Sequence, residues 1–176
     1  VIIATRHDSH YKLVIDSLKK GKNTFVEKPL ALNNDQLDQI IEVINSKQRK
    51  ERSNGEATNY PMLLVGYNRR YSPHLISIKQ SLGEGKGPVN IISNMNAGFI
   101  PLDHWVHDLN QGGGRIIGEA CHLIDVCVYL SGSLVRSVCM NHLGEKSDLG
   151  TDNASIMLKF QDGSNAVINY FSNGSK

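Results

Sequence analysis

Three short apolar runs in the first part of the chain predict buried strands. The runs cover residues 1–5, 24–26 and 63–66. Each is bounded by glycine, proline or polar residues, as is typical of strands in a parallel sheet. Apolar residues at helical spacing fill the gaps between them, first from Leu13 to Leu18, ended by Gly21, and then from Leu37 to Ile44. This order predicts the later part of a doubly wound α/β domain.

The pattern changes after about residue 70. The Ser-Pro pair at 72–73 is typical of a helix start, and a second helix is predicted from about residue 116 to 130. Strands are predicted in four further segments: 89–95, 135–140, 154–160 and 166–171. The last two strands flank Asp162-Gly163, which is a strong hairpin signal. This half therefore predicts an α+β unit with an open, largely antiparallel sheet.

Charge and cysteine content narrow the class of protein. The 176 residues include 19 basic and 17 acidic ones spread along the chain, which gives no reason to expect nucleic acid or an anionic membrane as partner. No apolar run approaches the ~20 residues that span a bilayer. Cys121, Cys127 and Cys139 lie in apolar stretches without paired spacing, so we expect reduced thiols and a cytoplasmic protein. The chain opens at Val1 within a strand pattern, which we interpret as the start of a fragment.

The clearest chemical signal follows the predicted strand 24–26. Glu27, Lys28 and Pro29 come directly after it. Ligands of open parallel sheets bind beyond the carboxyl ends of the strands, so Lys28 is expected to face a ligand. The simplest alternative is a lysine that ends the strand in solvent.

A second group of candidate residues lies between 103 and 125. Glu119 and His122 are three positions apart, as are His122 and Asp125, so the spacing predicts an imidazole between two carboxylates on one helix face. Such a histidine can act as a general acid or base. The glycine triplet at 112–114 indicates a close backbone approach or positive φ angles.

A zinc hydrolase is a competing interpretation of the same region. His104 and His107, with Cys121 or His122, offer imidazole and thiolate ligands. However, the sequence has neither a paired cysteine motif nor the helical spacing of a zinc protease. We therefore predict no metal site, and elemental analysis distinguishes the two interpretations.

Four motifs in order resemble the Gfo/Idh/MocA oxidoreductase family over nearly the whole chain. They are Ala4-Thr5 with 7–10, Val26-Glu27-Lys28-Pro29-Leu30, Val65-Gly66-Tyr67-Asn68-Arg69-Arg70-Tyr71, and Gly112-Gly113-Gly114 leading to His122-Leu123-Ile124-Asp125. Residues 96–105 and 114–119 resemble a branch of this family that is encoded with surface-polysaccharide biosynthesis. Some members of that branch are fused to a zinc-type alcohol dehydrogenase unit.

The resemblance implies a domain organisation and a reaction. Residues 1–69 would be the remainder of a Rossmann domain for NAD or NADP, and residues 70–176 an incomplete C-terminal domain for substrate binding. The sheet of that domain would form a homo-oligomer. The reaction would be hydride transfer between the nicotinamide and a hydroxyl or carbonyl carbon of a sugar or nucleotide sugar.

The same resemblance assigns roles to individual residues. Lys28 would hydrogen-bond the reacting oxygen, and His122 would exchange its proton. The residues expected to border the cofactor are Thr5, His7, His10, Glu27, Lys28 and Pro29. The residues expected to contact the sugar are Arg69, Asn96, His104 and Trp105. A cis peptide bond before Pro29 is common in the family and would fix the direction of Lys28.

The sequence departs from the family pattern at two places, and both bear on whether the chain is catalytic. Many relatives carry an aspartate four residues before the histidine, where this chain has Gly118. Glu119 comes one residue later, rotated by about 100° on an α-helix, and is our third catalytic candidate. The glycine-rich Gly-x-Gly-x-x-Gly loop that binds pyrophosphate is absent from the sequence, so we expect the isolated chain to be inactive. The competing function is a non-catalytic sugar-binding or scaffolding module.

Overall fold

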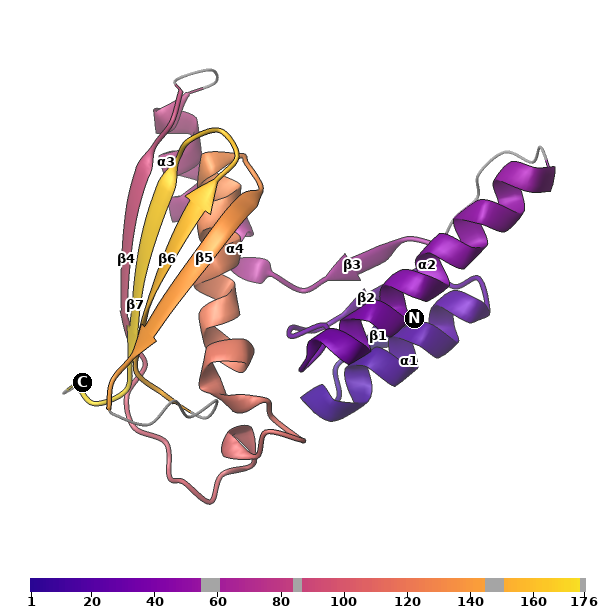
Figure 1. Ribbon diagram of the computed structural model, residues 1–176, viewed down its shortest axis with the longest axis horizontal. Coiled ribbons are helices and arrows are strands. Elements are labelled where there is room, and N and C mark those ends of the chain that lie inside the picture. Colours follow the sequence, from indigo (N-terminus) through magenta and orange to yellow (C-terminus); the bar gives the residue numbers. More distant parts are fainter. Residues whose placement is uncertain (55–60, 84–86, 145–150, 175–176) are drawn as a thin grey trace.

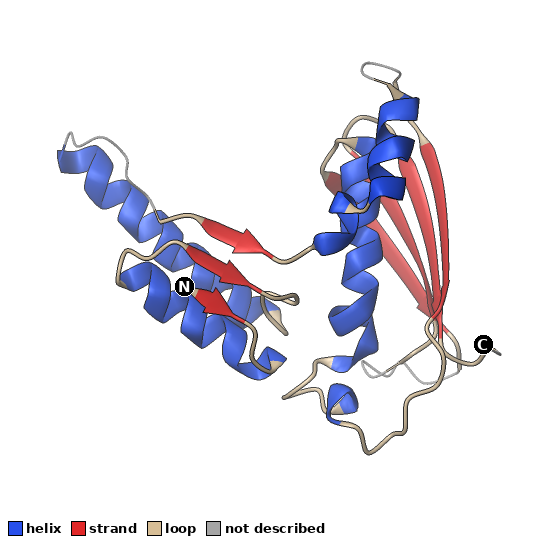
Figure 2. Cartoon of the chain, turned by 180° about the vertical axis from the view of Figure 1, so that it is seen from behind, coloured by secondary structure: helices blue, strands red, loops and turns tan. Residues whose placement is uncertain are grey.

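The computed structural model describes residues 1–54, 61–83, 87–144 and 151–174. The chain forms two units that lie side by side, each with its own sheet (Figure 1). Seen from behind, the N-terminal sheet carries its helices on one face, and helices of the second unit pack on one face of its sheet (Figure 2). None of the described helices combines the length and apolar character needed to cross a membrane.

The N-terminal unit is the predicted strand and helix alternation. Its elements are β1 (Ile2–Ile3), α1 (His7–Lys19), β2 (Thr24–Val26), α2 (Asn34–Asn54) and β3 (Leu63–Val65). The three strands pair in parallel in the order β1-β2-β3. Helix α1 is followed by Gly21 at a φ of +68°, the left-handed conformation that favours glycine after a helix. Buried Val14, Leu18 and Ile40 pack from the helices against Ile3 and Val26.

The C-terminal unit combines short helices with a four-stranded sheet. Its elements are η1 (Asn68–Tyr71), α3 (Pro73–Leu82), β4 (Asn90–Asn96), η2 (Trp105–His107), the π-helix η3 (Ile116–Ala120), α4 (Cys121–Ser131), β5 (Val135–His142), β6 (Ala154–Phe160) and β7 (Asn165–Phe171). The strand order is β4-β7-β6-β5. Strands β5, β6 and β7 pair antiparallel, which confirms the prediction, whereas β4 pairs with β7 in parallel.

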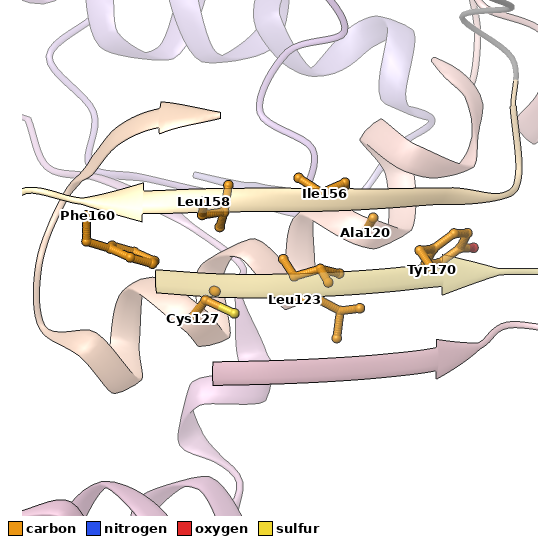
Figure 3. Close-up of a cluster of buried hydrophobic side chains, with 9 residues drawn as sticks. Ala120, Leu123, Cys127, Ile156, Leu158, Phe160 and Tyr170 are labelled. Atoms are coloured by element: carbon orange, nitrogen blue, oxygen red, sulfur yellow. The ribbon is translucent and has the colours of Figure 1, made fainter. Parts of the chain in front are cut away.

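Helix α4 packs on the buried face of this sheet (Figure 3). Strand β6 alternates strictly between buried and exposed residues, as a strand with one covered face should. Its Ile156 and Leu158 contact the same core as Leu123 and Cys127 of α4. The helix that supplies this core also carries His122, so core packing determines where His122 lies.

The helix begins in an irregular turn. The sequence predicts one continuous helix from about residue 116, but the first five residues, Ile116–Ala120, are π-helical. Helix α4 then continues in regular form to Ser131 and is ended by Gly132 at a φ of +72°. Single π turns inside α-helices occur frequently at functional sites.

Candidate active site

Lys28 extends from the end of β2 to the other unit. Its Nζ donates a hydrogen bond to the carbonyl oxygen of Gly118 at 2.6 Å. The Lys28–Pro29 peptide bond is cis, as the family resemblance implied. The side chain is half-buried, so the structure excludes the alternative of a lysine that simply ends the strand in solvent.

His122 lies on the opposite side of this junction. Its side chain is 9% exposed, and its Nδ1 atom has no hydrogen-bond partner among the described residues. Burial, together with the nearby charges of Lys28 and Arg69, lowers the pKa of His122 to about 4. The ring is therefore neutral at pH 7 and can accept a proton. The Tyr67 ring is nearly perpendicular to it, with ring centroids 6.2 Å apart.

The two carboxylates predicted to flank His122 bind arginines instead. Asp125 forms an ion pair with Arg70, with 3.0 Å between Arg70 Nε and Asp125 Oδ2. Glu119 accepts hydrogen bonds from Arg115 Nε at 3.0 Å and from the Tyr170 hydroxyl at 2.7 Å. The planar guanidinium matches a carboxylate better than an imidazole does, so three-residue spacing alone gave the wrong partner. A catalytic role for Glu119 has no support in these contacts.

Arg115 organises the residues around Glu119. Although it is charged, its side chain is only 1% exposed. It donates to the carbonyl oxygen of Gly98 at 2.7 Å, and its Nη1 lies 3.6 Å from Oδ2 of Asp152. Burial opposes ionisation of Glu119, but hydrogen bonds from Arg115 and Tyr170 keep its carboxyl pKa below the ordinary value. Sequence reasoning missed Arg115; its position four residues before Glu119 on a helix was the available signal.

The residues predicted to border a cofactor gather at the carboxyl ends of β1 and β2. Thr5 Oγ1 lies 2.6 Å from Ser9 Oγ at the end of β1. His10 is fully buried, with Nδ1 2.8 Å from the Pro29 carbonyl oxygen and Nε2 3.0 Å from that of Thr5. Both ring nitrogens of His10 are thus occupied by protein. The half-buried Glu27 follows β2 directly, as predicted.

His7, another predicted cofactor neighbour, is buried against the second unit. Its Nδ1 lies 2.8 Å from the carbonyl oxygen of Gly112. Trp105, a predicted sugar ligand, meets the His7 ring edge-on, with centroids 4.9 Å apart. The exposed ring of His104 lies beside Trp105, with centroids 5.7 Å apart. These residues therefore line the contact between the two units.

The other two predicted sugar ligands differ in position. Arg69 is close enough to His122 to contribute to its lowered pKa, and its Nη1 lies 3.7 Å from Met95 Sδ. Asn96 occupies the face of β4 opposite the one that packs on α4, and its Oδ1 accepts a hydrogen bond from the Gly98 amide. The structure thus brings Arg69 to His122 but does not bring Asn96 there, because strand alternation directs its side chain to the other face.

Metal ligands do not converge within the parts of the chain that the structure describes. No three His, Cys, Asp or Glu side chains form a group there that could hold an ion. His107 lies with Nδ1 3.6 Å from Asp152 Oδ1, while His104 is exposed. The zinc interpretation gains no support from this arrangement.

The glycine triplet 112–114 shows both features that its sequence indicated, a close backbone approach and positive φ angles. A Cβ atom on Gly112 would lie 2.4 Å from the carbonyl oxygen of Val106, closer than any side chain allows. Gly113 and Gly114 both have a φ of +77°. Close approach and left-handed backbone are therefore both required in this triplet.

Fold and site together define a Rossmann-type α/β unit joined to a sheet-based α/β domain, with Lys28 and His122 both at the junction. Residues 1–54 match the model of the oxidoreductase family with an NAD-binding Rossmann fold. Residues 86–175 match the GFO/IDH/MocA C-terminal domain. The chain belongs to the Gfo/Idh/MocA family.

Several characterised proteins are similar over most of this chain. It is 25% identical over 178 residues to the inositol 2-dehydrogenase of Rhizobium meliloti (strain 1021) and 27% identical over 178 residues to the myo-inositol 2-dehydrogenase of Thermotoga maritima; each comparison covers 96% of this chain and 48% of the relative. The chain thus spans about half the length of the curated relatives it matches. The crystal structure of myo-inositol dehydrogenase from Lactobacillus casei in complex with NAD(H) and myo-inositol superposes with a TM-score of 0.73 at 17% identity, covering 98% of this chain and 48% of that one. At this identity the superposition shows the shared fold alone.

Proposed function

We propose that this chain supplies the hydride-transfer site of an NAD(P)-dependent dehydrogenase or reductase that acts on a hydroxyl or carbonyl carbon of a sugar or cyclic polyol. The observation that carries the proposal is that Lys28 reaches across the two units to Gly118, four residues before His122, close enough for its charge to lower the pKa of His122. Lys28 presents an ammonium group from the end of a parallel strand, and His122 presents a neutral imidazole with a buried, unpartnered nitrogen. The inositol dehydrogenases among the relatives make a cyclic polyol the first substrate to test.

The residues present fit the nicotinamide end of a dinucleotide. Thr5, Glu27 and Lys28 lie at the carboxyl ends of adjacent parallel strands, where such ligands bind. The buried Nδ1 of His122 requires a partner that no described residue supplies. The sequence has no Gly-x-Gly-x-x-Gly motif, so no residue here is assigned to the pyrophosphate. When bound, the nicotinamide accepts or donates the hydride.

Lys28 and His122 have complementary tasks in this proposal. The Lys28 ammonium has three donors, of which one is directed to Gly118. A second donor can bind the substrate oxygen and stabilise negative charge that develops there. His122, held neutral by its lowered pKa, accepts the hydroxyl proton during oxidation and returns it during reduction. The proton and the hydride thus leave the substrate by separate routes.

Lys28→Ala tests this chemistry in the full-length protein. We expect turnover of myo-inositol or a nucleotide sugar with NAD or NADP to fall at least about 100-fold, because one donor to the reacting oxygen is lost. Lys22→Ala is the matched control, since Lys22 precedes the same strand and is exposed. Nicotinamide fluorescence measures cofactor binding, and circular dichroism verifies the fold.

The outcomes separate the two candidate functions. Unchanged turnover in Lys28→Ala would refute the assigned roles. Sugar binding without dinucleotide binding or turnover, in the unaltered protein, would favour the non-catalytic module instead. The non-catalytic alternative is favoured by Gly118, which has no carboxylate at the position where many relatives carry an acid.

The sheet face turned away from α4 supports a homo-oligomer, which we include in the proposal. One apolar row crosses all four strands in register: Ile92, Val167, Met157 and Cys139. Amide groups border the row on β4 and β7, where Asn169 Nδ2 donates to Asn94 Oδ1 at 2.7 Å and Asn165 Nδ2 to Asn90 Oδ1 at 3.1 Å. The amides beside the exposed apolar row already bind each other, so the row can pack against the same face of a second copy. Sedimentation velocity of the full-length protein tests this; a monomer at micromolar concentration would contradict it.

A further inference from the structure

The loop after β1 and the segment 104–118 form the main polar contact between the two units. The Asp8 amide donates to the Gln111 carbonyl at 3.1 Å. Arg6 Nη1 donates to Gln111 Oε1 at 3.2 Å, and the Arg6 guanidinium lies 5.5 Å from the centre of the Trp105 ring. His7 lies within this contact and is only 8% exposed.

The His7 ring contacts both ends of the segment 112–118. At one end Nδ1 lies 2.8 Å from the Gly112 carbonyl oxygen, which can only accept, so Nδ1 carries a proton. At the other end the ring lies against Gly118, where an added Cβ would be 3.2 Å from His7 Cε1. A side chain at position 118 would require the imidazole to move by a few tenths of an ångström.

The segment held by His7 also carries the partner of Lys28. Gly118 supplies the carbonyl oxygen that accepts the Lys28 hydrogen bond. The Gly112 carbonyl cannot easily turn elsewhere, because the backbone of Val106 packs directly on this glycine. Burial, followed by the charges of Lys28 and His10, lowers the pKa of His7, which favours a neutral ring with its single proton on Nδ1.

We propose that His7 is a positioning residue of the candidate active site, whose Nδ1–H fixes the segment 112–118 on the N-terminal unit and thereby places the Gly118 carbonyl opposite Lys28. The catalytic consequence rests on the proposed function, whereas the structural role does not. His7 thus acts through the backbone of Gly118 rather than on the substrate.

Two substitutions separate the hydrogen bond of His7 from its ring packing. His7→Asn keeps a donor close to the position of Nδ1 but loses the ring. His7→Phe keeps a ring against Trp105 but loses the donor. In the full-length protein we expect amide hydrogen exchange of residues 112–118 to accelerate about tenfold in His7→Phe, as for the loss of one hydrogen bond, and much less in His7→Asn.

Turnover provides the second measurement. A displaced Gly118 carbonyl misdirects Lys28, so His7→Phe should lower kcat about tenfold or more with a smaller change in KM, and His7→Asn should recover most of kcat. His74→Phe and His74→Asn are the matched controls, because His74 is exposed on α3, and they should change neither measurement.

The possible results distinguish this role from the proposed function. Accelerated exchange in His7→Phe, in a protein that has no dehydrogenase turnover, would leave the positioning role intact and refute the proposed function. Equal exchange in both variants and the unaltered protein would overturn the positioning role. If His7→Phe does not fold, nitrogen NMR of the unaltered protein decides, because a His7 ring with an unprotonated Nδ1 would also overturn it.

Discussion

On the N-terminal side of the candidate active site the side chains are held by backbone carbonyl groups, whereas on the C-terminal side they are held by ion pairs in which one partner is buried. His10 binds the carbonyls of Thr5 and Pro29, and Lys28 binds that of Gly118. Across the junction, Arg115 binds the Glu119 carboxylate. Neutral carbonyls cost little to leave unpaired compared with a buried charge, so the C-terminal side should be the more sensitive to single substitutions.

Arg115→Met gives the strongest test of this difference. Removing the buried cation leaves the carboxylate of Glu119 without its main partner, so we expect the free energy of unfolding to fall by roughly 3–5 kcal/mol. Urea denaturation followed by circular dichroism measures the loss. Arg136→Met, at an exposed position on β5, is the control and should change little. A loss below that of an ordinary surface substitution would show that Arg115 does not stabilise the C-terminal unit.

A double variant measures how strongly Arg115 and Glu119 depend on each other. Arg115→Met combined with Glu119→Gln removes both charges, so it should be more stable than Arg115→Met alone. The non-additive part of the two effects measures the pairing. If the two losses simply add, the carboxylate and the guanidinium do not depend on each other.

His10→Phe is the corresponding test on the N-terminal side. The ring volume is kept, but the carbonyl oxygens of Pro29, which is buried, and of Thr5, which is exposed, lose the ring nitrogens of the fully buried His10. We expect a loss of about 1–3 kcal/mol, the cost of unsatisfied neutral groups. The same urea titration measures it, with exposed His74→Phe as control. A loss as large as that of Arg115→Met would remove the distinction between the two sides.

Acidification from pH 7 to 5 should have an effect of the same order as that of His10→Phe. The pKa of His122 is about 4 in the folded protein against an ordinary value near 6.5. Between these values the unfolded chain binds a proton that the folded protein does not, so stability falls as pH decreases from about 6.5 towards 4 and is fully present above that window. The equilibrium constant for unfolding then changes by at most about tenfold for each pH unit.

His122→Gln isolates this pH dependence. The urea midpoint of the variant should vary less between pH 7 and 5 than that of the unaltered protein. His74→Gln should keep the original dependence. The lowered pKa of His7 acts in the same direction, so part of the slope remains in His122→Gln. Equal slopes in all three proteins would mean that His122 titrates normally.

Local sequence patterns predicted most of the elements. Strand β6 was placed at 154–160 as observed, because every second residue is apolar. The start of α3 was also predicted correctly: Ser72 Oγ accepts a hydrogen bond from the Leu75 amide, and Pro73 opens the helix. These features depend on contacts within a few residues, which is why the sequence contains enough information to locate them.

The missed features depend on residues far apart in the chain. Burial of Arg115 requires Gly98 and Tyr170 from other elements. The parallel pairing of β4 with β7 joins segments separated by about 75 positions, as between Asn90 and Asn165. Lys28 and His122 could be identified as candidates from their motifs, but the Gly118 partner of Lys28 could not, because it lies in the other unit.

The π turn of Ile116–Ala120 changes how this region is to be aligned with related sequences. A π turn contains one more residue than an α turn. The helix on either side of it can therefore keep its direction while the number of residues between two aligned positions increases by one. Counting back from His122 as in a regular helix pairs Gly118 with the aspartate of many relatives. Allowing a one-residue gap in this turn pairs Glu119 with it instead. Backbone superposition on a relative, rather than residue numbering, therefore decides whether Gly118 or Glu119 corresponds to that aspartate.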